Sequence, residues 1–125
     1  MDLYREFILD HYKHPRNVGE LSPCDGKNDR ANAVCGDKLS IFVNWEEREG
    51  EHVVTDMKWN GVGCAISQAS ASILSELVIG KSVAEILAFD RKTVEEYIGT
   101  PLTPARTKCA ILALDALQKA LVPID

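Results

Sequence analysis

Four cysteines and one aspartate are the residues of this chain best suited to chemistry. The cysteines are Cys24, Cys35, Cys64 and Cys109, and Asp37 follows Cys35 after a single glycine. No two cysteines form the C-x-x-C pair of a zinc finger, so a shared site must be assembled from distant segments. A thiol and a carboxylate two residues apart could be two metal ligands, or a thiol beside an acid for proton transfer. They could also belong to a turn, because Asn, Gly and Asp are turn residues.

The sequence after Asp37 is typical of a β-strand. Its residues alternate between two faces over 38–46, and one of these faces carries Leu39, Ile41, Val43 and Trp45. This period predicts a strand with at least one buried face. The same parity, extended backwards, places Cys35 and Asp37 on one side of the strand, roughly 6–7 Å apart. Cys35 is therefore expected where this strand opens.

Cys64 lies where a second predicted strand, 52–60, gives way to a helix that begins at Ala65. The apolar face of this strand consists of Val53, Met57 and Trp59. Two glycines in "GVGC" permit close approach of the backbone before Cys64. At the start of a helix, free N–H groups and the helix dipole favour a thiolate.

Cys109 is expected in the second turn of a last helix, which begins at Pro104 and ends near Leu121. Basic neighbours, Lys108 among them, favour a thiolate there. Cys109 could equally be a small core residue on an amphipathic helix. Cys24 lies in a loop rich in Pro, Gly, Asn and Asp, and we interpret it as a free loop thiol.

The remaining segments are predicted to be mostly helical. A first helix spans 3–13, with Leu3, Phe7 and Ile8 on its buried side, and the three histidines, His11 among them, are expected to be surface or capping residues. Two short helices should follow the capping residues Ser82 and Asp90. This order indicates an α+β fold, with a small antiparallel sheet of about three strands and helices packed on one face. We expect a single domain over residues 1–125.

Composition and charge exclude several partners. The chain has 125 residues, of which 46% are hydrophobic and 26% charged, and its formal net charge is −5. Basic residues form no run, so nucleic acid and anionic membranes are not expected as partners. No apolar stretch reaches the roughly 18 residues of a membrane span, and the N-terminus has no signal-peptide core. We expect a cytoplasmic protein, in which thiols stay reduced.

Four motifs together resemble the U-type iron–sulfur cluster assembly scaffolds, the IscU/NifU/SufU group. They are "DHYKHPRNVGEL", "VCGDKLSIFV", "WNGVGCAISQASASILSELVIGKS" and "KCAILALDALQKAL". The resemblance implies that Cys35, Asp37, Cys64 and Cys109 bind a transient 2Fe–2S cluster, with a zinc or iron ion as an alternative occupant. It also implies that a cysteine desulfurase donates the sulfur and that apo iron–sulfur proteins receive the cluster. Such a protein is a scaffold and carrier and not an enzyme.

The chain combines features of two branches of that group. IscU-type members carry a histidine immediately before the third cysteine, where this chain has Lys108, and "ARTKCA" is similar to the SufU-type context. SufU-type members usually carry an insertion before the last helix, for which this chain has no room. A second hypothesis is therefore a SufU-like, zinc-bound activator of a desulfurase, in which Cys109, Cys64 or Cys35 accepts a persulfide. Lys108 is predicted to gate the site by pairing with Asp37 when no metal is bound.

Other readings and partners have less support in the sequence. A zinc hydrolase or thiol enzyme with Cys64 as nucleophile needs a general base, and no histidine accompanies the cysteines. A purely structural zinc site is not needed by a chain of this length. Residues 102–106, "LTPAR", differ from the Leu-Pro-Pro-Val-Lys docking motif of bacterial IscU members, so dependence on an Hsp70-type chaperone is not expected. Self-association into a homodimer is kept as an alternative to a monomer.

Overall fold

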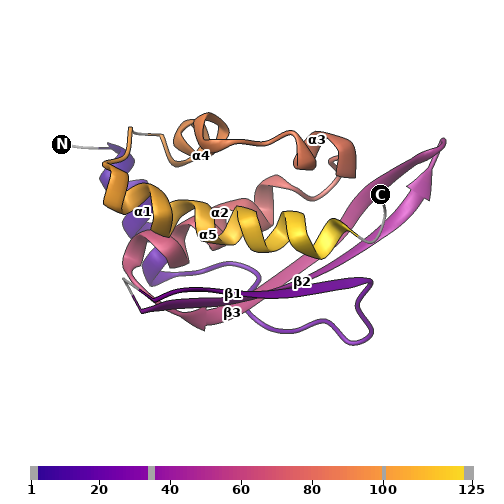
Figure 1. Cartoon of the computed structure of the whole chain (residues 1–125), viewed down its shortest axis with the longest axis horizontal. Coiled ribbons are helices and arrows are strands. Elements are labelled where there is room, and N and C mark those ends of the chain that lie inside the picture. The colour runs from indigo at the N-terminus through magenta and orange to yellow at the C-terminus, as the bar shows by residue number, and fades with distance from the viewer. Residues whose placement is uncertain (1–2, 34–35, 100, 123–125) are drawn as a thin grey trace.

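The predicted α+β fold is confirmed. The computed structural model describes residues 3–33, 36–99 and 101–122, and its three strands form an antiparallel sheet in the order β1-β2-β3. Figure 1 shows the helices gathered over one face of this sheet. In chain order the elements are α1 (Leu3–Lys13), β1 (Gly26–Asn32), β2 (Asp37–Arg48), β3 (Glu51–Val62), α2 (Ala65–Leu77), α3 (Val83–Leu87), α4 (Arg91–Ile98) and α5 (Pro104–Leu121).

The buried face of the sheet continues to the first residue of β2. Leu39, Ile41 and Val43 are fully buried, as the alternation predicts, and they belong to the main hydrophobic core. Asp37 has the same parity and is 1% exposed, so its carboxylate also lies under the helices. A carboxylate at such a depth requires polar partners, and these are found at the metal centre described below.

A β-bulge between β2 and β3 changes which residues of β3 are buried. Asn44 pairs with Asp56 but Trp45 pairs with Val54, so β3 holds one extra residue there. Val54 is consequently 1% exposed and Val53 is only half-buried. The expected burial of Val53 was wrong, because a two-residue period does not count the extra residue. Met57 and Trp59 lie in the core as predicted.

The first helix is buried through a different face than expected. Leu3 and Phe7 are 72% and 42% exposed, whereas Ile8 and His11 are buried. The His11 ring lies 2.7 Å from the Ser72 hydroxyl of α2, measured from Nδ1 to Oγ. Burial lowers the pKa of His11 below its usual value. The prediction of His11 as a surface or capping residue was therefore wrong, because α1 docks through a polar contact.

The predicted helix starts are confirmed by their caps. The side chains of Ser82, Asp90 and Thr103 each accept a backbone N–H at the beginning of α3, α4 and α5. Gln118 of α5 donates hydrogen bonds to the carbonyl groups of Ile86 and Phe89, which hold α5 against α3 and the residues that follow it. Over the described residues, no helix is both long and apolar enough to cross a membrane.

Candidate metal centre

Three of the predicted ligands meet at one end of the sheet. A carboxylate oxygen of Asp37 and the sulfur atoms of Cys64 and Cys109 all lie within 4.8 Å of one another. Asp37 begins β2, Cys64 lies between β3 and α2, and Cys109 lies in the second turn of α5. Two thiolates and a carboxylate form a donor set that suits zinc or iron. The chemistry of these side chains therefore fits a metal centre.

Asp37 joins the strand to the helix that starts beside it. Its Oδ1 accepts a hydrogen bond from the Cys64 backbone N–H at 2.8 Å. Cys64 is the N-cap residue of α2, and its own side chain makes no capping bond. The other carboxylate oxygen, Oδ2, lies 4.0 Å from the Cys64 sulfur. One oxygen of Asp37 is thus held by the backbone while the other faces the thiol.

Gly63 lets these groups approach one another. Its φ is +159°, and a Cβ atom placed there would lie 2.4 Å from Asp37 Oδ1 and 2.6 Å from the Ser67 hydroxyl oxygen. Real Cβ contacts are not that short, so a side chain at this position would push the carboxylate away. Gly63, the second glycine of "GVGC", thus has a steric role at the centre. This agrees with the close approach of the backbone that the two glycines were expected to permit.

Ser67 and Gln68 line the centre, although the sequence did not indicate them. The Ser67 hydroxyl donates to the Cys64 carbonyl at 3.0 Å, and the Gln68 side-chain amide donates to the Gly63 carbonyl at 2.9 Å. The available signal was spacing, since a serine three residues into a helix can bond back to the capping residue.

The remaining predicted site residues have different positions. Cys35 lies outside the described residues. Lys108 is exposed, and the described residues show no ion pair between it and Asp37. The gating role of Lys108 therefore stays a prediction, and zinc affinity in Lys108→Met is its test. Cys24 is half-buried in the loop before β1 and does not belong to the group of ligand atoms found in the described residues.

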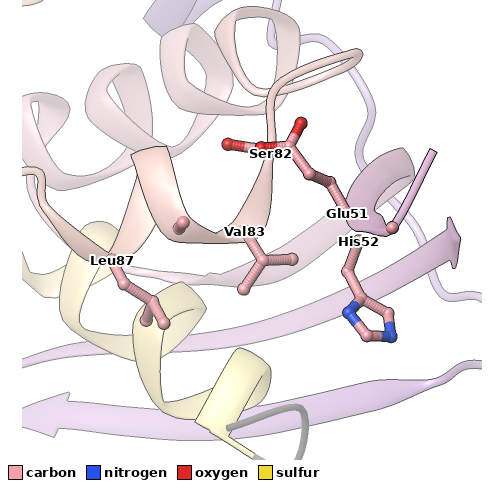
Figure 2. Close-up of a pocket in the computed structure, with 7 residues that line it drawn as sticks. Glu51, His52, Ser82, Val83 and Leu87 are labelled. Atoms are coloured by element: carbon pink, nitrogen blue, oxygen red, sulfur yellow. The ribbon is translucent and has the colours of Figure 1, made fainter. Parts of the chain in front are cut away.

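A pocket of about 260 Å³ lies elsewhere, between the β2–β3 turn and α3. Figure 2 shows residues that border it, among them Glu51, His52, Ser82 and Val83. None of the three metal-ligand candidates in the described residues borders this pocket. The three metal-ligand candidates and this pocket are therefore separate features of the fold.

Comparisons with known proteins find one matching family and relatives that are named for iron–sulfur cluster assembly or sulfur transfer. The family model described as the NifU-like N terminal domain matches residues 3–123. The iron–sulfur cluster assembly scaffold protein IscU 1 of Archaeoglobus fulgidus is 34% identical over 120 residues, which cover 96% of this chain and 75% of the relative. The zinc-dependent sulfurtransferase SufU of Bacillus subtilis is 35% identical, over 95% of this chain and 89% of the relative.

A solved structure of similar fold supports the same grouping. The FiSufU protein of Fervidobacterium islandicum AW-1, described as an iron–sulfur cluster assembly scaffold protein for the SUF system, matches with a TM-score of 0.76. It is 28% identical in sequence, and the match covers 93% of this chain and 94% of that structure. The fold and the sequence motifs therefore lead to the same set of relatives.

Proposed function

This chain belongs to the family of NifU-like N-terminal domains, and from that premise we propose that it is a scaffold for iron–sulfur cluster assembly. In this proposal it accepts sulfur from a cysteine desulfurase, builds a transient 2Fe–2S cluster and transfers it to apo-proteins. The cluster is cargo, so the site must hold it and then release it. The hydrophobic core shared by the sheet and helices supports a single domain for this task.

The convergence of Asp37, Cys64 and Cys109 is the observation that carries the proposal. Cys35, two residues before Asp37, is the fourth proposed ligand. Thiolates bind iron strongly, whereas a carboxylate oxygen is a harder and more easily exchanged ligand. Asp37 Oδ1 is held by the Cys64 N–H, which leaves Oδ2 as the single oxygen facing the Cys64 sulfur. These features suit a site that releases what it binds.

A zinc-dependent sulfur acceptor is the second candidate function. The identity with SufU of Bacillus subtilis and the Lys108–Cys109 context favour it. In that role a thiolate of this chain attacks the outer sulfur of the desulfurase persulfide. The persulfide S–S bond breaks, a new S–S bond forms on this chain, and the desulfurase cysteine leaves as a thiolate. The SufU alignment spans 136 positions, more than the 125 residues present here, so that relative has residues that this chain lacks.

Anaerobic reconstitution separates the two functions. The chain is incubated with ferrous iron, cysteine and a cysteine desulfurase, and its metal content and visible absorption are measured. A scaffold should acquire iron and sulfide with the absorption of a 2Fe–2S cluster and pass them to an apo-ferredoxin. A protein that keeps zinc under these conditions and only accelerates the desulfurase would contradict the scaffold function and support the second candidate.

A further inference from the structure

The Ser67 hydroxyl lies between the backbone and the sulfur of Cys64. Its oxygen is 3.0 Å from the Cys64 carbonyl oxygen, to which it donates, and 3.8 Å from the Cys64 sulfur. The side chain is fully buried, so water does not compete for these contacts. The Ser67 hydroxyl is therefore close enough to change its hydrogen-bond partner when the Cys64 sulfur binds a metal.

The Cys64 carbonyl does not depend on Ser67 alone. The backbone N–H of Gln68 donates to the same carbonyl oxygen at 3.2 Å, as expected in the first turn of a helix. If the hydroxyl turned away, the carbonyl would keep a hydrogen-bond donor. A buried acceptor left without any donor would cost about 1–3 kcal/mol, and that cost does not arise here.

The direction of these bonds must change when Cys64 binds a metal. In the thiol form, the single Cys64 S–H can donate to the Ser67 oxygen at 3.8 Å or to Asp37 Oδ2 at 4.0 Å, while the Ser67 O–H donates to the carbonyl. A metal-bound sulfur carries no proton, because the metal replaces it. Lone pairs of the sulfur and of the Ser67 oxygen would then face each other. A rotation of the hydroxyl about its C–O bond turns this repulsion into an O–H···S hydrogen bond.

We propose that Ser67 is a positioning residue for Cys64, whose hydroxyl donates to the carbonyl in the metal-free protein and to the sulfur when Cys64 holds a metal. This inference rests on the proposed metal centre. Hydrogen bonds to a metal-bound sulfur orient it and tune its electron donation to the metal. Because Gly63 has no Cβ, the Ser67 oxygen has room beside Cys64 for this exchange. Ser67 would therefore adjust the metal–sulfur bond without being a ligand.

Cobalt(II) is the probe for the test, because sulfur-to-cobalt charge transfer reports the electron density on the sulfur. Co²⁺ is added to the metal-free parent chain and to Ser67→Ala, and their near-ultraviolet spectra are compared. The alanine variant lacks the O–H···S bond, so its charge-transfer band should move to longer wavelength. Ser67→Ala should still fold, since Gln68 continues to satisfy the Cys64 carbonyl, and far-ultraviolet circular dichroism checks this.

Ser70→Ala is the matched control. Ser70 is also fully buried on α2, and its hydroxyl donates to the Ala110 carbonyl at 2.7 Å and lies near the Tyr97 hydroxyl. Both variants should lose thermal stability, but only Ser67→Ala should move the band. An unmoved band in Ser67→Ala, or an equal shift in Ser70→Ala, would overturn the inference. A parent chain without any sulfur-to-cobalt band would instead overturn the metal centre itself.

Discussion

Asp37 Oδ1 accepts the backbone N–H of Cys64 at 2.8 Å, so one metal-ligand candidate caps the helix that starts beside another. The carboxylate therefore has two tasks. As a cap it stabilises the start of α2, where the first N–H groups have no partner within the helix. As a ligand it must share its charge with a metal. The balance between the two tasks underlies the first prediction.

Asp37→Ala should hold a reconstituted cluster longer than the parent chain. The thiolates remain, while the exchangeable carboxylate, at whose position an acceptor thiolate would enter, is removed. We therefore expect slower decay of the visible absorption under chelator and slower transfer to an apo-ferredoxin. Loss of the cap should also lower the free energy of unfolding by about 1 kcal/mol.

Asp37→Asn is the matched variant for this prediction. Its amide oxygen can still accept the Cys64 N–H, so the helix cap should be largely retained while the charge is lost. Slow cluster release in both variants would assign the effect to the charge. Faster loss of absorption in Asp37→Ala than in the parent would mean that the carboxylate anchors the cluster, and the exchangeable-ligand account would then be wrong.

Gly63→Ala should weaken metal binding by an amount that backbone strain alone would not cause. The new Cβ would lie 2.4 Å from Asp37 Oδ1, so the carboxylate must move. Gly19→Ala is a close control, because Gly19 has φ +148° and open space around its Cβ position. Both variants should lose stability through strain, of order 1–3 kcal/mol. Only Gly63→Ala should lose zinc affinity by tenfold or more in a chelator competition, and equal losses would refute the steric role.

The cysteines should divide into ligands and a bystander. Cys35→Ser, Cys64→Ser and Cys109→Ser should each abolish or severely weaken cluster retention, because each removes a thiolate from the proposed set. Cys24→Ser is the control, since Cys24 is half-buried like Cys64 but lies in the loop before β1. Iron and sulfide content after desalting is the measurement. Loss of the cluster from Cys24→Ser alone would refute the ligand assignment.

Stability should fall as the pH drops below about 6.5, the ordinary pKa of histidine. Burial lowers the pKa of His11 in the folded chain, so between the two pKa values the unfolded chain binds more protons. Stability from this group is therefore fully present above pH 6.5 and decreases as the pH falls toward the folded pKa. Urea midpoints measured from pH 7.5 to 5 should show this decrease.

His11→Gln should reduce that pH dependence. The amide cannot gain a proton in this range, and it can still bond to the Ser72 hydroxyl that His11 contacts. His14→Gln, which replaces an exposed histidine, is the control and should keep the parent profile. If His11→Gln retained the full slope, the buried histidine would not be its source.

Local chemistry made much of the fold predictable from the sequence. Ser82, Asp90 and Thr103 cap helices because a cap depends only on residues a few positions away. The shared centre joins distant segments, and it was expected from the resemblance to the U-type scaffolds together with the positions of the cysteines and Asp37 at element ends. The β-bulge beside Trp45 and the burial of the His11 side chain were not predictable, because both depend on contacts between distant segments. Capping of α2 by Asp37 is likewise a contact across 27 residues of chain.

The three ligand candidates lie far apart in the sequence, so metal binding would change the stability of the fold. Asp37 and Cys64 lie at the open end of the β2–β3 hairpin, where β2 begins and after β3 ends, and Cys109 lies on α5. An ion held by all three would be a cross-link between chain segments that are otherwise joined by long connections. Such links remove conformational freedom from the unfolded chain, and more so when they close long loops. Loading the site would thus stabilise the folded domain, and each delivery of cargo would remove that stabilisation.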